Sequence, residues 1–200
     1  DWDCKVHRMY QEKNYGCDPS EYISQKWAFS MVDKCIVLED DDVPSVSFFT
    51  FCKEMLDKYE QDTRIAMIAG FNNEEITPDV PYDYFFASTF SIWGWASWKR
   101  VIDQWDEHYT FLEDKFNMQQ LEQLIKERKF RKDFIYMCHR HKENNKAYYE
   151  TIFHASMLFN SGLAIVPTRN MINNLGVTAD STHFAGSVHT LPKGYRRIFT

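Results

Sequence analysis

A short apolar run that ends in a block of acidic residues sets the strongest limit on the fold of this chain. Residues 35–38 (Cys-Ile-Val-Leu) form a continuous apolar stretch, which is typical of a buried strand in a parallel sheet. Residues 39–42 (Glu-Asp-Asp-Asp) follow directly, and after Pro44 a helical pattern starts with Ser45 as its predicted N-cap. A second apolar run occupies residues 65–70. This order predicts a βαβ unit with parallel strands and a right-handed crossover.

Other segments extend this unit to an α/β domain. The patterns predict strands at 5–10, 84–88 and 163–166, helices at 20–31 (with Ser20 as N-cap), 118–131 and 148–159, and an aromatic turn that leads into a helix over 93–105. We therefore expect a mostly parallel mixed sheet flanked by helices, within a single domain of residues 1–200.

Composition narrows the class of protein and its location. The net charge of −6 and the pI near 5.6 argue against a general nucleic-acid binder, whose footprint is a basic face. The five cysteines are irregularly spaced, which favours a reducing compartment over a disulfide framework. No run approaches the roughly 20 apolar residues of a membrane span. We expect a cytoplasmic protein without a transmembrane segment, and a peripheral place at the membrane stays open.

The position of the acidic residues suggests a ligand site. In open α/β sheets, ligands bind at the carboxyl ends of the strands. Adjacent carboxylates repel one another unless a cation neutralises them, and Mg²⁺ or Mn²⁺ commonly combines one or two carboxylates with substrate phosphates. A solvated acidic turn is the alternative, and the chemistry alone does not decide between the two.

Several blocks of the sequence resemble GT-A-fold glycosyltransferases, most closely N-acetylglucosaminyltransferase I and related bacterial sugar transferases. Residues 36–49 resemble the "LEDD…P-x-FF" stretch of these enzymes, and residues 93–100 (WGWASWKR) are very similar to the "WGWATWKR" of the bacterial members. Residues 14–17, 64–72 and 165–183 resemble further blocks in the same order. The resemblance implies a GT-A fold, and it also implies that a first strand and helix of the nucleotide-binding half are missing from this chain.

The resemblance implies roles for the acidic residues. Asp41 would hold Mn²⁺ or Mg²⁺ against the diphosphate of the donor, while Glu39 and Asp40 would contact its ribose and sugar. Asp42 departs from the usual pattern of the family, so we include it with the donor-binding residues without a separate role.

The resemblance also assigns residues outside the acidic block. Trp93, Gly94 and Trp95 would border the sugar, whereas we expect Trp98 to lie in the core. Glu150 occupies the position of the base that deprotonates the acceptor hydroxyl. Tyr149, which replaces the usual Trp before it, would border the substrate. His183 would be an additional metal or phosphate contact.

The implied activity is metal-dependent inverting transfer from a nucleoside-diphosphate sugar, most plausibly a UDP-sugar, to a saccharide or lipid-linked acceptor. Three alternatives remain: a haloacid-dehalogenase-type phosphatase that uses Asp40 and Asp42, a non-catalytic saccharide-binding relative, and a nucleotidyltransferase. A zinc site at residues 138–141 (Cys-His-Arg-His) lacks a second pair of ligands at a suitable spacing.

Overall fold

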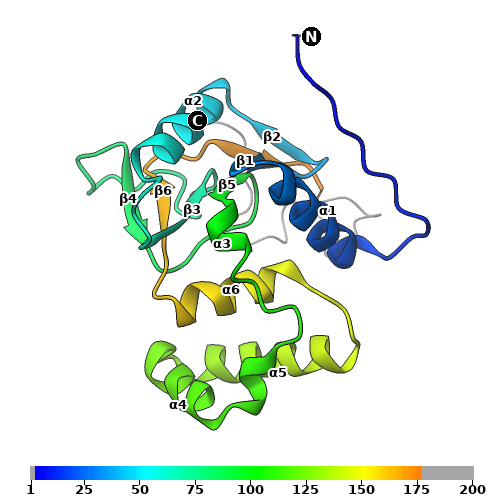
Figure 1. Ribbon diagram of the computed structural model, residues 1–200. Coiled ribbons are helices and arrows are strands. Elements are labelled where there is room, and N and C mark those ends of the chain that lie inside the picture. The colour runs from blue at the N-terminus through cyan, green and yellow to red at the C-terminus, as the bar shows by residue number, and fades with distance from the viewer. Residues whose placement is uncertain (1–2, 177–200) are drawn as a thin grey trace.

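The computed structural model describes residues 3–176 and shows an α/β fold with a mixed sheet between helices (Figure 1). The elements in chain order are α1 (Cys17–Met31), β1 (Lys34–Val37), β2 (Asp42–Pro44), α2 (Val46–Lys58), β3 (Ile65–Ala69), β4 (Tyr84–Ala87), β5 (Trp95–Trp98), α3 (Lys99–Ile102), the 3₁₀ helix η1 (Thr110–Glu113), α4 (Lys115–Leu124), α5 (Arg128–Glu143), α6 (Tyr149–Phe159), β6 (Leu163–Pro167) and β7 (Ile172–Asn174). No helix among these residues is long and apolar enough to cross a membrane.

The main sheet has the strand order β1-β5-β3-β6-β4 and is mostly antiparallel. Only the β3–β6 pair of this sheet is parallel, so the prediction of a mostly parallel sheet was wrong. β1 and β3 run in the same direction, because β5 is antiparallel to both. They do not pair with each other, because β5 lies between them and pairs with each. The sequence patterns indicated an aromatic turn where β5 lies.

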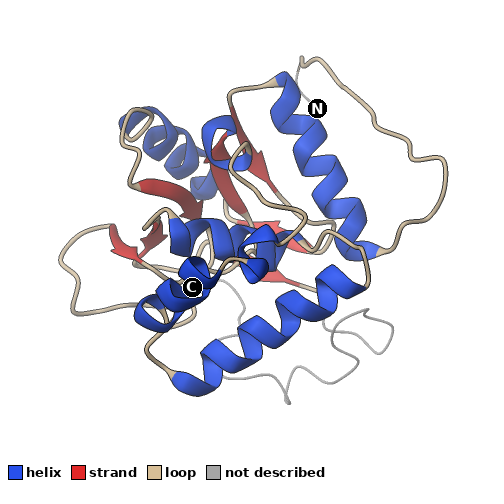
Figure 2. Ribbon diagram, turned by 60° about the horizontal axis from the view of Figure 1, so that its bottom comes forward, coloured by secondary structure: helices blue, strands red, loops and turns tan. Residues whose placement is uncertain are grey.

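The two tryptophans of β5 explain how the helices cover the sheet. Trp95 packs against Phe29 of α1 and Phe153 of α6, and Trp98 donates a hydrogen bond to the carbonyl of Leu56 in α2. α2 therefore covers one face of the sheet, while α1 and α6 cover the other, as the two views show (Figures 1 and 2). α4 and α5 lie beyond α6, on its side away from the sheet.

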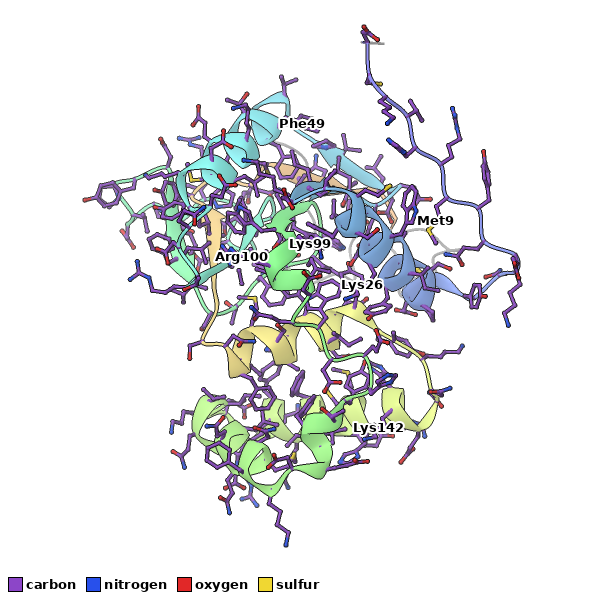
Figure 3. All side chains as sticks on the ribbon, in the orientation of Figure 1. Met9, Lys26, Phe49, Lys99, Arg100 and Lys142 are labelled. Carbon is purple, nitrogen blue, oxygen red and sulfur yellow. The ribbon has the colours of Figure 1, made fainter. Side chains whose placement is uncertain are left out.

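The predicted strand at 5–10 is not present. These residues have no regular secondary structure, and Val6 and Tyr10 are exposed. Figure 3 shows Met9 on this segment, which runs outside α1. An alternating pattern cannot form a strand by itself, because its backbone groups need a partner strand.

Two helix boundaries also differ from the prediction. α1 begins at Cys17 rather than after Ser20, since Gly16 has the N-cap position and Pro19, which has no N–H, fits the first turn. The single helix predicted over 118–131 is two helices, because the Glu127 side chain accepts from Lys129 N and Phe130 N and so starts α5.

A second, small sheet forms between β2 and β7, with Asp42 opposite Asn174. It brings the last described residues of the chain onto the acidic turn that follows β1. The fold thereby creates a site at this turn from segments that are far apart in the sequence.

Candidate functional site

The acidic residues 39–42 form a tight turn between β1 and β2, in which the backbone N–H of Asp42 donates to the carbonyl of Glu39 (3.2 Å). The turn gives the four side chains different surroundings. Asp40 is exposed, whereas the other three are half-buried. Four similar residues in a row therefore have different chemical properties.

Asp42 connects three segments of the chain. Its Oδ2 accepts from the backbone N–H groups of Gly94 (2.9 Å) and Glu39 (3.1 Å), and its Oδ1 lies 3.5 Å from Nδ2 of Asn174. Burial raises the pKa of this carboxyl to about 6, although the two backbone hydrogen bonds and Asn174 favour its charged form. Asp42 holds the turn in shape, and both of its oxygens are already hydrogen-bonded.

Asp41 offers a carboxylate oxygen that is still available. Its Oδ1 accepts from Nδ2 of Asn174 (2.7 Å), while its Oδ2 accepts no hydrogen bond from residues 3–176. The backbone of Gly176 lies directly against Oδ2, and a Cβ at this position would overlap it. A glycine is therefore needed at this position for the backbone to approach Oδ2 so closely.

The side chains of the turn could bind a divalent cation only together with oxygen atoms of a bound substrate. Within residues 3–176, no group of three or more His, Cys, Asp or Glu side chains could hold a metal ion. Asp41 could supply one oxygen, with Asp40 exposed beside it, and phosphate and water oxygens would have to complete the coordination. This arrangement is common for Mg²⁺.

Glu39 connects the turn to α6. Its Oε1 accepts a hydrogen bond from the hydroxyl of Tyr149 (3.0 Å), whose ring is fully buried. Burial, with smaller contributions from Glu21 and Asp42, raises the pKa of Glu39 to about 8. Tyr149, the residue expected to border the substrate, therefore anchors Glu39 from the core.

Glu150 lies in the first turn of α6, next to Tyr149. Its carboxylate is half-buried, and no side chain among residues 3–176 donates a hydrogen bond to it. Burial, together with the charges of Asp18 and Glu21, raises the pKa of Glu150 to about 7. A carboxylate with a pKa near neutrality is suited to act as a general base.

The residues of the Trp93-Gly94-Trp95 segment do not share one role. Trp95 is fully buried among Phe29, Tyr149 and Phe153, so the expectation that its ring borders a sugar is wrong for this structure. Trp98 is in the core, as expected. Gly94 has φ 57°, and a Cβ there would meet Ile172 at 2.5 Å, so the glycine lets β7 pack against it.

Trp93 is half-buried and packs edge-on against Phe71, with 4.8 Å between the ring centroids. A cavity of about 360 Å³ lies beside Phe71 and reaches Ser91. Of the three residues of this segment, Trp93 alone is partly exposed, but it does not line this cavity. His183 lies outside the described residues.

Sequence reasoning missed two parts of this site. Asn174 binds Asp41 and Asp42, and the similarity of residues 165–176 to a family block was the signal that could have drawn attention to it. Asp18 and Glu21 of α1 act on the pKa of Glu150, and no sequence pattern connects them to it.

A cavity of about 730 Å³ lies at the start of α1 and the end of α5 rather than at Asp41.

Within residues 3–176 the cysteines take part in no metal-binding group. All five are free thiols, and Cys138 is buried in α5.

No protein-family model matches this chain, and a search of curated proteins finds no match to it.

Proposed function

We propose that this chain is the catalytic domain of an inverting, metal-dependent glycosyltransferase with a GT-A fold, which transfers a sugar from a nucleoside-diphosphate sugar to a saccharide or lipid-linked acceptor. The observation that carries the proposal is the hydrogen bond between Glu39 and Tyr149. This contact joins the acidic turn to the start of α6, which supports placing Asp41 and Glu150 in one site. The ordered blocks of similarity to sugar transferases support sugar transfer as the function of this site.

The two carboxylates would divide the chemistry between them. A Mn²⁺ or Mg²⁺ ion, held by Asp41 and the phosphates, would neutralise the leaving diphosphate. Glu150 would accept the proton of the acceptor hydroxyl while the hydroxyl oxygen forms its bond to the anomeric carbon. The bond from that carbon to the phosphate oxygen breaks at the same time, and a single in-line attack inverts the configuration.

The raised pKa of Glu150 supports its role as the base. At neutral pH the group is close to half-ionised, because burial and the acidic side chains of α1 disfavour its charge. A proton taken from the acceptor is therefore held more tightly than it would be by an ordinary glutamate. The carboxylate accepts a hydrogen bond from its own backbone N–H, and no side chain among residues 3–176 competes with a substrate hydroxyl for it.

The phosphatase alternative has less support from the geometry. It requires Asp42 to exchange a proton with a substrate, but both oxygens of Asp42 already accept hydrogen bonds, Oδ2 from Glu39 and Gly94 and Oδ1 from Asn174. A non-catalytic saccharide-binding protein would need neither a Glu150 carboxyl whose pKa is raised to about 7 nor the carboxylate of Asp41 at the turn.

Calorimetric titration with a panel of nucleotide sugars, with and without Mn²⁺, tests the proposal. We expect Mn²⁺-dependent binding of a UDP-sugar that is lost in Asp41→Asn and kept in Asp133→Asn, which changes an exposed aspartate of α5. Glu150→Gln should bind the donor normally but fail to transfer the sugar. Donor binding that is unchanged in Asp41→Asn would refute the metal assignment, and full transfer by Glu150→Gln would refute the base.

A further inference from the structure

The charge of α5 is opposite in sign to that of the whole chain. The helix contains six Lys or Arg residues and two Asp or Glu residues, which gives it a net charge of +4. The whole chain has a net charge of −6, so the chain without α5 carries −10. α5 lies beyond α6, on the side away from the sheet and from the acidic turn that follows β1 (Figure 1). The molecule is therefore electrically polarised, with a basic helix at one end.

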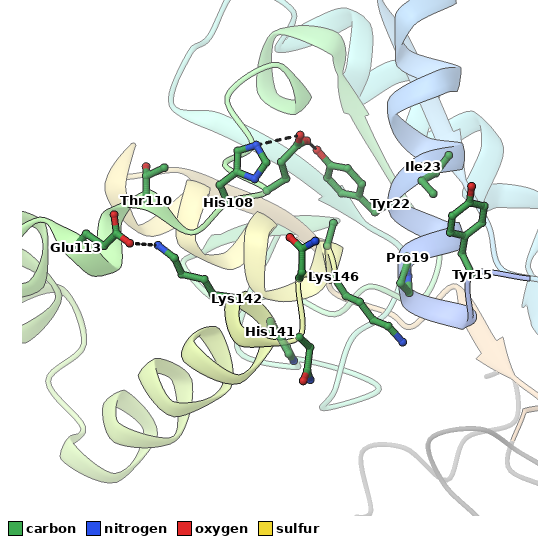
Figure 4. A pocket seen from close by; sticks show the side chains of 14 residues that line it. Tyr15, Pro19, Tyr22, Ile23, His108, Thr110, Glu113, His141, Lys142 and Lys146 are labelled. Carbon is green, nitrogen blue, oxygen red and sulfur yellow. Dashed lines mark hydrogen bonds and ion pairs between the residues drawn. The ribbon is translucent and has the colours of Figure 1, made fainter.

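Most of the cations of α5 are available to an external partner. Four of them are exposed and form no ion pair within residues 3–176, namely Arg128, Lys129, Lys132 and Arg140. Lys142, near the end of the helix, is instead paired with Glu113 at 2.7 Å (Figure 4). Neighbouring like charges on a helix repel one another, so an anionic surface that approaches them lowers the free energy of the cluster.

The outward face of α5 is charged, and its apolar face is already buried. Four residues follow one another at intervals of three or four positions and so share one face of the helix: Lys129, Lys132, Tyr136 and Arg140. Phe134 and Cys138, on the opposite face, are buried in the core. A partner protein that binds a helix in an apolar groove needs a continuous apolar stripe, and in α5 that stripe is taken. The outward face suits an extended anionic surface better.

Large apolar side chains are exposed among these cations. They belong to α5 and to α4, whose C-cap carbonyl at Ile125 accepts a hydrogen bond from Arg131 of α5 (2.8 Å). The exposed side chains are those of Phe116, Leu124, Phe130, Tyr136 and Met137. Helices that lie in the interface of an anionic membrane combine Lys and Arg with aromatic and aliphatic residues, because the cations contact lipid phosphates while the apolar side chains enter the headgroup region. A nucleic acid offers phosphates but no such apolar layer.

We propose that α5, together with the adjoining α4, binds the surface of an anionic phospholipid bilayer and lies along it without crossing it. An anionic surface repels the remainder of the chain, with its net charge of −10, and attracts α5. The attraction therefore orients the molecule with α5 toward the lipid. This binding involves neither Asp41 nor Glu150, so it does not depend on the proposed transferase activity.

Co-sedimentation of the whole chain with vesicles tests the proposal. One set of vesicles consists of equal parts of phosphatidylcholine and phosphatidylglycerol, and the other of phosphatidylcholine alone. We expect binding to the anionic vesicles that weakens as salt is added, and no binding to the neutral ones. Inorganic phosphate at the concentration of the lipid should not displace the protein, because it provides no apolar layer.

Charge variants locate the binding face. Lys129→Glu combined with Lys132→Glu should weaken binding to the anionic vesicles by at least about tenfold, because each Lys near an anionic surface contributes to the attraction. Lys129→Gln combined with Lys132→Gln should cause a smaller loss, and it keeps the test valid if the charge reversal disturbs the helix. Lys5→Glu combined with Arg8→Glu is the matched control, since it changes the net charge equally in the exposed segment before α1 and should retain the binding.

A second pair of variants tests the apolar contact. Tyr136→Ala should weaken vesicle binding by roughly three- to tenfold, as expected when an aromatic ring no longer leaves water. Tyr82→Ala changes an exposed tyrosine before β4 and should leave the binding unchanged.

Three results would overturn the proposal. They are no binding to the anionic vesicles, an equal loss of binding in the control with Lys5 and Arg8 changed, and binding to a DNA or RNA duplex without binding to vesicles. The two proposals of function also fail separately. Vesicle binding by a chain that binds no nucleotide sugar would retain the membrane face and refute the transferase, whereas sugar transfer without vesicle binding would do the reverse.

Discussion

At the scale of single residues, two adjacent aspartates of the acidic turn have different roles. Asp42 stabilises the turn, whereas Asp41 is the proposed metal ligand. Asp42 accepts from two backbone N–H groups, whereas Asp41 accepts from one side-chain amide and keeps Oδ2 open. The two residues are adjacent and of the same type, so only their partners distinguish them. This difference leads to opposite expectations for stability and for metal binding.

We expect Asp42→Ala to lower the free energy of unfolding by about 2–4 kcal/mol, because it leaves the N–H groups of Gly94 and Glu39 without their acceptor. Asp41→Ala removes one hydrogen bond at a half-buried site and should cost about 1 kcal/mol. Urea denaturation of both variants measures the difference. An equal loss for the two would contradict the structural role of Asp42.

The role of Glu150 predicts a pH dependence of catalysis. A general base works in its deprotonated form, so kcat/KM should rise with pH through about 7, the raised pKa of Glu150, and level off above it. Glu150→Gln should lower kcat by about 10²- to 10⁴-fold. Glu143→Gln changes an exposed glutamate at the end of α5 and should retain both the rate and the profile. A rate that is independent of pH between about 5 and 8 would exclude Glu150 as the base.

At the scale of the elements, α6 is the helix that joins the sheet to the site. Its buried face holds Trp95 and Trp105 through Tyr149 and Phe153, and its first turn contains Glu150. The Tyr149 hydroxyl extends from this core to Glu39. The position of α6 thus depends on the same packing that orients the proposed base.

Tyr149→Phe tests this connection. The change removes the hydroxyl from a fully buried ring and should lower the free energy of unfolding by about 1–2 kcal/mol. It should also raise the pKa of Glu39 further, because the hydrogen bond from Tyr149 favours the charged form. Chemical denaturation and ¹³C NMR titration of the Glu39 carboxyl measure the two effects. Tyr136→Phe, at an exposed position of α5, is the control and should change neither quantity.

At the scale of the whole molecule, folding raises the pKa of three carboxyl groups from different parts of the chain. They are Glu39 after β1, Asp42 in β2 and Glu150 in α6, with pKa values of about 8, 6 and 7. Burial is the leading cause in each case. The folded protein therefore binds protons more tightly at these groups than the unfolded chain does.

At these three groups, the excess of bound protons predicts a contribution to stability that falls as pH rises. This contribution should begin to fall near the ordinary carboxyl values of 3.8 to 4.5 and continue to about pH 8, where Glu39 is the last of the three to ionise. His141 and His154 act in the opposite direction, because burial lowers the pKa of both. Mn²⁺ with UDP should stabilise the protein most at the higher pH, since a cation at the turn favours the ionised carboxylates. Thermal melts across this range, with Mn²⁺ and UDP or with EDTA, measure the effect. In Asp41→Asn the stabilisation by Mn²⁺ should disappear, and stabilisation that is retained would contradict the metal assignment.

The local pattern of the sequence determined most of the elements by itself. The apolar runs at β1, β3 and β6 and the three- and four-residue spacing of α2 depend on near neighbours, and the structure has these elements within a few residues of the prediction. The acidic turn after β1 was also evident, because a change from apolar to charged residues marks the end of a strand.

Only the tertiary structure decided how these elements pair and which side chains meet. β5 was not recognised, because its four residues are too short a run to show a period, and its place between β1 and β3 depends on pairing with segments far away in the chain. The separate environments of Asp41 and Asp42 depend on Gly94, whose N–H binds Asp42 from 52 residues away in the chain. Trp95 is buried because α1 and α6 both pack on its face of the sheet. Contacts between segments so far apart follow from chain topology and burial, on which local propensity carries no information.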